Sequence, residues 1–459
     1  MSYLVGISQK EIPYQKDLWL CGYVGRDHTA TGVHDPLFVK CISIGDGANT
    51  VIFICCDLIG VESTFAQKTI AKISEKIGVS KNNIVICCTH THSGPNTIYM
   101  LGMGKVSEQF LDMLADTILT CALDAYHNCS AATITLHRGV GTIGVNRVLQ
   151  QMWGGPETEN WETRNWDGED QADILPVDQL LEQGLSPDTY VDNELLVLRV
   201  YDDKGTRALL INYACHPVVL EYTNYQISAD FLWGLQHSLK AIYPDAAVLF
   251  LNGCCGDINP TVRGGFEAAS QLGAQLAENV LCALKNDGKI LSHSVRVKCT
   301  RFSAPLDIAV DEETLGRRLD HYAKKLEAER GKDSTAEKVY NVYTQWAEKI
   351  REQIRASTLK RNIDAELRII QVGDLAIATL PFEVFHEVGK EIKKAVSPGN
   401  TMVAAYANGE NGYFVSSTLY PYAKYERFEA FKFSGEPGPI AKGVDQEVVR
   451  LFTYLAERE

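Results

Sequence analysis

The amino-acid sequence predicts an α/β fold, with a mixed β-sheet core, flanking helices and one inserted helical hairpin. Apolar runs of strand length alternate with helical patterns, for example over residues 65–77 and 108–126. Four of the apolar runs lead to a His, Asp or Glu beside Gly or Pro. Since open α/β sheets bind ligands at the carboxyl ends of their strands, we expect these polar residues to form a metal site there.

The first of these runs, residues 84–87, precedes the segment Thr-His-Thr-His-Ser-Gly-Pro at 89–95. Side chains at i and i+2 of a strand share a face, so His90 and His92 are expected to point the same way at the strand end. Neutral imidazole is a common zinc ligand, which makes the pair a candidate for part of a metal site. The alternative is a pair of polar or core histidines, because His-x-His alone has little specificity.

The other three runs bring further polar groups to strand ends. Residues 208–211 precede Cys-His-Pro, whose proline biases His216 toward an extended backbone. Residues 247–251 lead into a loop that contains Asp257, and residues 375–380 end just before Glu383. One imidazole and two carboxylates are therefore expected near the first two histidines.

Two segments interrupt this α/β pattern within what we expect to be a single domain, residues 1–459. Residues 150–190 are polar, aromatic and irregular, which predicts a loop that is either a lid or a surface excursion anchored by its tryptophans. Residues 311–358 are highly charged with apolar residues at helical spacing, which predicts an antiparallel helical hairpin. Its charges are expected to form a solvated face rather than an interaction surface.

The composition argues against nucleic-acid-binding and membrane-anchored classes of protein. The 459 residues are 45% hydrophobic and carry a formal charge of −14, so no basic surface is expected for nucleic acid or anionic membranes. No run has the length of a membrane span and the N-terminus lacks a signal-like core, so we expect a cytoplasmic protein without a membrane anchor. The 13 cysteines, with no Cys-x-x-Cys, are expected to be mostly free thiols. A small-molecule substrate is expected, and assembly into a homo-oligomer is left open.

Five motifs follow one another along the chain. They are Thr-His-Thr-His-Ser-Gly-Pro (89–95), Cys-His-Pro (215–217), Gly-Asp-Ile-Asn-Pro (256–260), Pro-Phe-Glu (381–383) and Asn-Gly-Glu-Asn-Gly-Tyr (408–413). This order resembles the catalytic N-terminal domain of the neutral/alkaline ceramidase superfamily, over nearly the whole chain. The resemblance implies a zinc ion held by His90, His216, Glu383 and Tyr413.

The resemblance also implies residues that contact the substrate. Asn146 and Arg147 resemble an Asn-Arg pair of the family, whose arginine helps hold the substrate carbonyl by paired hydrogen bonds. Asp230 belongs to a Ser-Ala-Asp segment that resembles a family segment near the site. For Arg147 the alternative is a buried structural salt bridge.

Two departures from the family pattern are visible. Asn259 stands where the family has a serine thought central to amide cleavage, and an amide side chain cannot act as a hydroxyl nucleophile. Asn259 is instead expected to hydrogen-bond the substrate. The sequence also ends at Glu459, too early for the family's immunoglobulin-like C-terminal domain, so we expect a shorter ceramidase-like member.

Catalytic roles follow from the expected zinc site. Two neutral histidines, a carboxylate and a tyrosine oxygen suit zinc, which can lower the pKa of its water to about 7. His92 would either accept a proton or hold the oxyanion, or else support His90. Asp257 would be either the general base or a turn carboxylate that caps backbone amides. Tyr413 is expected both to bind the metal and to act in catalysis.

The leading hypothesis is a soluble zinc-dependent hydrolase that attacks an amide or ester carbonyl of a small polar substrate directly. The alternatives are a zinc-dependent lactonase or glycoside-cleaving enzyme, a true ceramidase, and a non-catalytic metal-containing binding protein.

Overall fold

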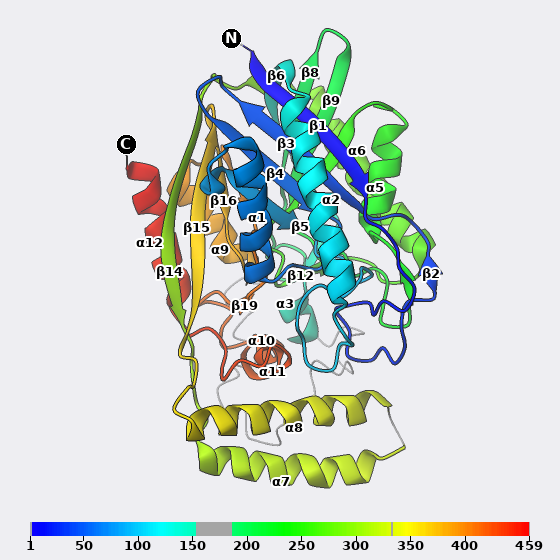
Figure 1. Ribbon diagram of the computed structural model, residues 1–459, viewed down its shortest axis with the longest axis vertical. Helices are drawn as coiled ribbons and strands as arrows, with labels where there is room; N and C mark the ends of the chain where they lie inside the picture. The colour runs from blue at the N-terminus through cyan, green and yellow to red at the C-terminus, as the bar shows by residue number, and fades with distance from the viewer. Residues whose placement is uncertain (1, 153–185, 332–333, 459) are drawn as a thin grey trace.

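The computed structural model describes residues 2–152, 186–331 and 334–458, and its core contains two β-sheets that share one apolar layer (Figure 1). The larger sheet has the strand order β11-β9-β8-β6-β1-β3-β4-β5, and the smaller has the order β14-β15-β16-β18. The predicted loop at 150–190 lies almost wholly outside the described residues.

The strands of the larger sheet are β1 (Tyr3–Glu11), β3 (Phe38–Gly45), β4 (Thr50–Cys56), β5 (Ile84–Cys88), β6 (Ser130–Val140), β8 (Glu194–Asp202), β9 (Gly205–Tyr213) and β11 (Ala247–Asn252), with β13 (Lys289–Ile290) paired to β6. Those of the smaller sheet are β14 (Val295–Pro305), β15 (Asn362–Val372), β16 (Leu375–Thr379) and β18 (Thr401–Ala404). Short pairs join β2 (Gly32–Val33) to β10 (Gln226–Ile227), β7 (Gly144–Asn146) to β12 (Ile258–Pro260), and β17 (Glu383–Val384) to β19 (Tyr413–Phe414).

Helices cover the outer faces of both sheets (Figure 1). On the larger sheet lie α1 (Ser63–Ile77), α2 (Glu108–His127), α5 (Phe231–Lys240) and α6 (Phe266–Lys285), and on the smaller lie α9 (His386–Val396) and α12 (Val444–Glu457). The remaining helices are η1 (Lys81–Asn83), α3 (Arg147–Met152), α7 (Glu312–Glu329), α8 (Ser334–Arg355), α10 (Lys424–Phe428) and α11 (Ala430–Phe433). The predicted α/β class with a mixed sheet and flanking helices is confirmed.

The alternation of side chains along each strand explains the two layers of the core. In β4, Val51 and Phe53 belong to the apolar cluster shared by the two sheets, whereas Ile52 and Ile54 belong to the cluster shared with the helices. Both faces of the strand are thus buried. This is why these runs are continuously apolar in the sequence, without the polar alternation of a half-exposed sheet.

The chain after β18 connects the two edges of the larger sheet near the strand ends. The Ala405 amide donates to the Asn252 carbonyl (3.1 Å), and the Cys88 amide donates to the Tyr406 carbonyl (3.2 Å). The carboxyl ends of β5 and β11 are therefore held by the same short segment. This places the loops that follow both strands close together.

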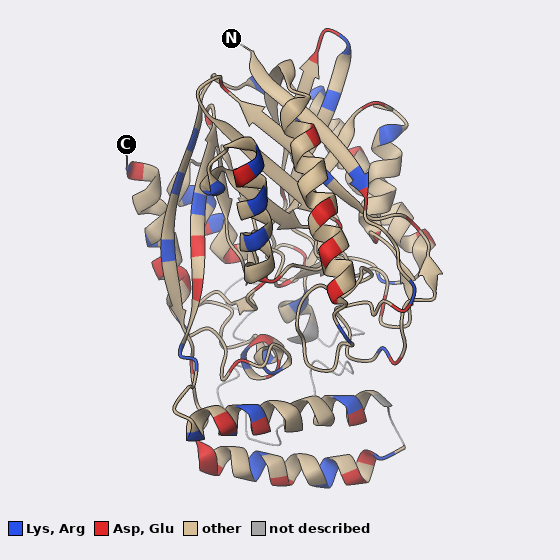
Figure 2. Cartoon of the chain, viewed as in Figure 1, with Lys and Arg blue, Asp and Glu red and all other residues tan. Residues whose placement is uncertain are grey.

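The hairpin of α7 and α8 lies at one end of the molecule, beyond α10 and α11 (Figure 1). Acidic and basic residues alternate along both helices (Figure 2), as the sequence predicts. One face of α8 is nevertheless buried, with Tyr343, Trp346 and Ile350 packed in a cluster that includes residues of α11 and the loops near β5. Within the described residues, no helix combines the length and apolarity needed to cross a membrane.

Candidate metal and substrate site

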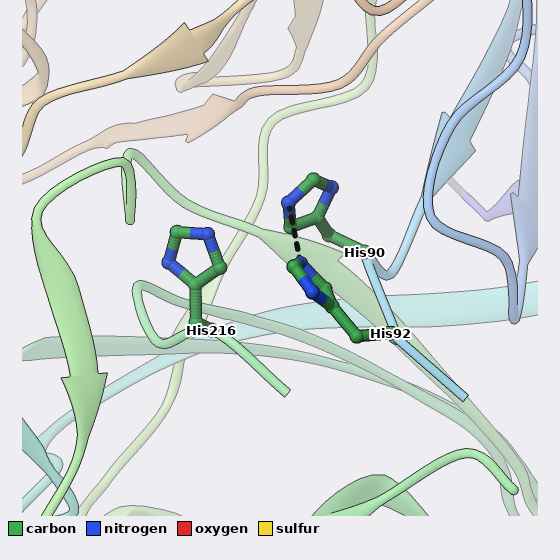
Figure 3. Close-up of side chains that lie close together, drawn as sticks. All are labelled: His90, His92 and His216. Atoms are coloured by element: carbon green, nitrogen blue, oxygen red, sulfur yellow. Dashed lines mark hydrogen bonds between the residues drawn. The ribbon is translucent and has the colours of Figure 1, made fainter. Parts of the chain in front are cut away.

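Three buried or half-buried histidines converge beyond the strand ends (Figure 3). The potential ligand atoms of His90, His92 and His216 all lie within 4.8 Å of one another. The Nε2 atoms of His90 and His92 are 3.3 Å apart. The structure therefore brings together both histidines of the first motif and the histidine of the second.

His90 lies in a loop, and its backbone conformation differs from the strand geometry expected from the sequence. Strand β5 ends at Cys88, and His90 has a φ of 70°, in the left-handed region. Its backbone amide donates to the Leu58 carbonyl (2.8 Å), and its Nδ1 lies 2.6 Å from the Ile59 carbonyl oxygen. The explanation by strand alternation is thus wrong, because the strand is too short to include either histidine.

His216 follows β9 and is held in the same manner. Its backbone amide donates to the Ile258 carbonyl (2.9 Å), and its Nδ1 lies 3.3 Å from that oxygen. A carbonyl only accepts hydrogen bonds, so Nδ1 can donate to it in both His90 and His216. In that tautomer each ring would present the lone pair of Nε2 to a metal ion, whereas without a metal a proton on His216 Nε2 can bond to Glu383.

Asn252, at the end of β11, ties the two histidine loops to each other. Its Nδ2 donates to the carbonyl oxygens of Thr89 (2.9 Å) and Cys215 (3.2 Å), the residues just before His90 and His216. Asn252 is fully buried. No motif in the sequence marks it as a site residue, although it does lie at the end of a predicted strand.

Glu383 and Tyr413 are neighbours on two short parallel strands. Residue Glu383 of β17 pairs in register with Tyr413 of β19. The Glu383 Oε1 atom is 2.7 Å from His216 Nε2 and 3.3 Å from His90 Nε2. All four residues predicted as ligands therefore lie in one region, with His92 as an additional member.

The protonation of the cluster follows from burial and mutual charge. Burial raises the pKa of the Glu383 carboxyl, but the neighbouring His90 and the hydrogen bond to His216 outweigh this and hold the pKa well below its usual range. Burial lowers the pKa of His216 to about 4 and that of His92 well below its ordinary value. Burial thus disfavours a charge on the His92 and His216 rings, while Glu383 remains a carboxylate.

This donor set fits a zinc ion. Two ligands about 2.05 Å from a tetrahedral zinc ion are about 3.3 Å apart, which matches the separation of the His90 and His92 Nε2 atoms. The His90 and His216 rings are each oriented by a backbone carbonyl, as metal-bound imidazoles commonly are. The same residues would otherwise form a buried carboxylate with few hydrogen-bond donors, which is costly without a cation.

The cluster opens into a pocket with a largely apolar wall. His90, His92, Glu383 and Tyr413 line it together with the apolar side chains Ile98, Met100, Met103, Leu306, Ile363, Phe431 and Ile440. Glu410 lies on the same wall, and burial together with the charge of Glu383 raises its pKa to about 7. An apolar wall next to a metal-binding cluster suits a substrate with a polar head and an apolar arm.

Arg147 is placed beside this pocket by the β7–β12 pair. Its guanidinium donates to Glu426, which lines the pocket, and its Nε donates to the Gly256 carbonyl (3.1 Å). It also lies over the Tyr413 ring, 5.3 Å from the centroid. The structural salt bridge considered as the alternative role is therefore present, and contact with a substrate carbonyl stays a prediction.

Asp257 and Asn146 belong to a neighbouring buried network. Asp257 accepts hydrogen bonds from the backbone amide of His386 (2.7 Å), the first residue of α9, and from the Asn146 side chain (2.8 Å). Its Oδ2 also lies 2.6 Å from His386 Nδ1. Both oxygens of Asp257 are thus already bonded. A capping carboxylate, as in the alternative considered above, describes these surroundings better than a general base does.

Asp230 and Asn259 lie on either side of the His216 loop and do not line the pocket. Asp230 caps α5 and accepts hydrogen bonds from the amides of Val219 (3.2 Å) and Leu220 (2.8 Å), which fixes the chain just after His216. Asn259 is buried, and its Nδ2 has no hydrogen-bond partner among the described residues. Asp230 is therefore a structural support, whereas Asn259 retains a free donor.

The fold and the cluster together define an α/β protein with a buried histidine–carboxylate site that could hold a metal ion. Comparison with known families gives the particular relationship. Residues 3–353 match the family described as neutral/alkaline non-lysosomal ceramidase, N-terminal, and the chain belongs to this family.

Two relatives agree with that assignment. The chain is 24% identical over 241 residues to a neutral ceramidase of Oryza sativa subsp. japonica, covering 50% of this chain and 27% of that protein. It is 26% identical over 168 residues to neutral ceramidase 3 of Arabidopsis thaliana, covering 34% and 23%. The chain thus matches about a quarter of the length of these curated relatives.

The fold also matches solved ceramidase structures. The neutral ceramidase of Pseudomonas aeruginosa superposes with a TM-score of 0.71 at 16% identity, covering 99% of this chain and 74% of the other. A ceramidase complexed with C2 superposes with a TM-score of 0.72 at 14% identity, covering 99% and 75%. At this identity the likeness establishes the fold.

Proposed function

We propose that this protein is a zinc-dependent hydrolase that cleaves the amide bond of an N-acyl compound. One observation carries the proposal: His90, His92 and Glu383 line a single apolar-walled pocket, with His216 in contact with Glu383 behind them. Family membership supports hydrolysis in general. The choice of zinc rests on the nitrogen and oxygen donors.

The residues of the chain would divide the chemistry as follows. His90, His216 and Glu383 would hold the ion, with His92 or Tyr413 completing the set. When bound, zinc would polarise the substrate carbonyl and activate water at neutral pH. Arg147, next to Tyr413 and paired with Glu426 of the pocket wall, would position the carbonyl end of the substrate.

The pocket argues against the small polar substrate suggested by the composition. Its apolar side chains would bury an alkyl chain and gain about 0.8 kcal/mol for each methylene group. The relatives from Oryza sativa and Arabidopsis thaliana are neutral ceramidases, so a ceramide-like N-acyl lipid falls within the proposed range. Asn259 does not line this pocket, and its amide side chain would not act as a nucleophile.

The test is turnover by purified protein of acetyl, octanoyl and palmitoyl amides, of a short-chain ceramide, and of matched lactones and glycosides. We expect amide cleavage that increases with acyl length, is lost after chelation and returns with zinc. Faster turnover of the lactones or glycosides would favour those activities instead. Absence of turnover in every series, from protein that contains metal, would contradict the proposal and favour a binding protein.

A further inference from the structure

Amide cleavage needs a proton for the departing nitrogen, and the carboxyl groups of the pocket can be compared for this role. Four glutamates line the pocket: Glu383, Glu410, Glu426 and Glu436. Glu383 contacts the histidine cluster, Glu426 forms an ion pair with Arg147, and Glu436 forms one with Lys360. Glu410 is the only one of the four with neither a basic nor a histidine partner among the described residues.

The position of Glu410 is fixed by its backbone surroundings. Its Oε1 accepts a hydrogen bond from the Gly412 amide (2.9 Å), and its side chain packs so closely on Gly60 that an added Cβ there would lie 2.7 Å from the Glu410 Cβ. The second carboxyl oxygen has no hydrogen-bond partner within the described chain. The next residue, Asn411, also lines the pocket, and its buried Nδ2 has no hydrogen-bond partner in the part of the chain that the structure describes.

We propose that Glu410 is the acid that protonates the leaving nitrogen, an inference that rests on the amide hydrolase function proposed above. Water oxygen bonds to the carbonyl carbon and loses one proton to the solvent. As the C–N bond breaks, the Glu410 carboxyl transfers its proton to the nitrogen, which leaves as an amine. A proton from the solvent then restores the carboxyl, so protons balance and Glu410 is unchanged after one turnover.

The electrostatic surroundings agree with an acid at this position. Burial is the main cause of the raised pKa of Glu410, the charges of Glu383 and Glu62 add to it, and His90 opposes it. Position singles out Glu410, since Glu383 contacts the histidines and the other two pocket glutamates pair with Arg147 and Lys360.

The test compares two substrates with the same acyl group, an N-alkyl octanamide and 4-nitrophenyl octanoate. The amine leaves only after it is protonated, whereas 4-nitrophenolate leaves as the anion. We expect Glu410→Gln to lower kcat/KM for the amide by about 10²–10⁴-fold. The loss on the ester should be at least about tenfold smaller than the loss on the amide.

Glu436→Gln is the matched control. Glu436 lines the same pocket, and its carboxylate pairs with Lys360. The ratio of amide to ester turnover should stay at the wild-type value in this variant. Equal losses on both substrates in Glu410→Gln, or no loss on the amide, would overturn the assignment.

Two readouts do not depend on turnover. Glu410→Gln should retain the wild-type metal content, and calorimetry should show octylamine binding weakened by about tenfold with octanoate binding unchanged. Weakened octanoate binding would assign Glu410 to the acyl side and contradict the proposal. If wild-type protein with metal cleaves neither substrate, the proposed function itself fails, a result distinct from failure of the Glu410 assignment.

Discussion

At the scale of single residues, the site depends on groups that orient the histidines as much as on the histidines themselves. The Nδ1 atoms of His90 and His216 each face a backbone carbonyl, and Asn252 bridges the residues that precede them. Such supports fix the ring orientation before a metal binds. The conformational entropy of the ligand side chains is therefore lost during folding and not when the metal binds.

Replacing Asn252 with Asp keeps the shape of the side chain and removes both donated hydrogen bonds. We expect the metal affinity to fall by about 10–100-fold, measured by competition with a chelator. Asn212→Asp is the control, because Asn212 donates in the same way to the Leu251 and Val403 carbonyls, away from the histidine loops. The prediction is contradicted if both variants lose metal equally.

Gly22 leaves room for the His92 ring. Its φ is +99°, and a Cβ at this position would lie 2.4 Å from His92 Nδ1. We expect Gly22→Ala to lower the free energy of unfolding by about 2–4 kcal/mol, from backbone strain and overpacking together. Gly47 has a φ of +93°, but a Cβ added there would have no neighbour within 4 Å. Gly47→Ala should therefore show only the backbone strain of about 1 kcal/mol. Urea unfolding measures both, and equal losses would exclude the contact with His92.

At the scale of secondary-structure elements, short segments bring the site together. The pair β17–β19 sets Glu383 beside Tyr413, and β7–β12 sets Arg147 beside Asp257. Asp257 then caps α9 through the His386 amide. Segments that are far apart in the sequence are thereby fixed around the pocket by only a few hydrogen bonds.

The role of Asp257 can be tested by Asp257→Asn, which removes the charge and one acceptor. If the residue caps α9 and orients His386, we expect the free energy of unfolding to fall by about 1–3 kcal/mol, measured in urea. Activity should fall in parallel with stability and recover at lower temperature. A variant with wild-type stability and no activity would instead support the general-base role.

Helix α8 supports the pocket wall from outside. Trp346 is fully buried, donates to the Glu436 carbonyl (2.7 Å) and lies against Phe431, a residue of the wall. We expect Trp346→Ala to cost about 3–5 kcal/mol of stability and to raise KM more for palmitoyl than for acetyl amides. Ile290→Ala, at a residue that is 65% exposed, is the control and should change neither. An equal rise in KM for both amides would contradict a role of α8 in the acyl wall.

At the scale of the whole molecule, the site lies where the carboxyl ends of strands from two sheets meet. The histidines follow β5 and β9 of the larger sheet, and Glu383 follows β16 of the smaller. The sequence predicts this grouping, because apolar runs that end in His or Glu are visible without a structure. It does not reveal the separation into two sheets, since a strand buried on both faces looks the same in either sheet.

Other features depend on contacts between distant segments. The positive φ of His90, the bridge made by Asn252 and the placement of Glu410 all involve partners far along the chain, and no local pattern encodes them. The helical hairpin is predicted correctly from its spacing and charge. Its buried face is not, because charged residues dominate the composition while Tyr343 and Trp346 pack inward.

The most direct test of the account is the metal content of the purified protein beside that of His216→Ala. We expect one equivalent of zinc in the wild type, and in the variant a loss of affinity of at least about 100-fold. His237→Ala, at an exposed position of α5, should keep the wild-type content. Wild-type protein that binds no divalent metal, or a His216→Ala variant that binds it as tightly as the wild type, would contradict the central claim that this cluster is a metal site.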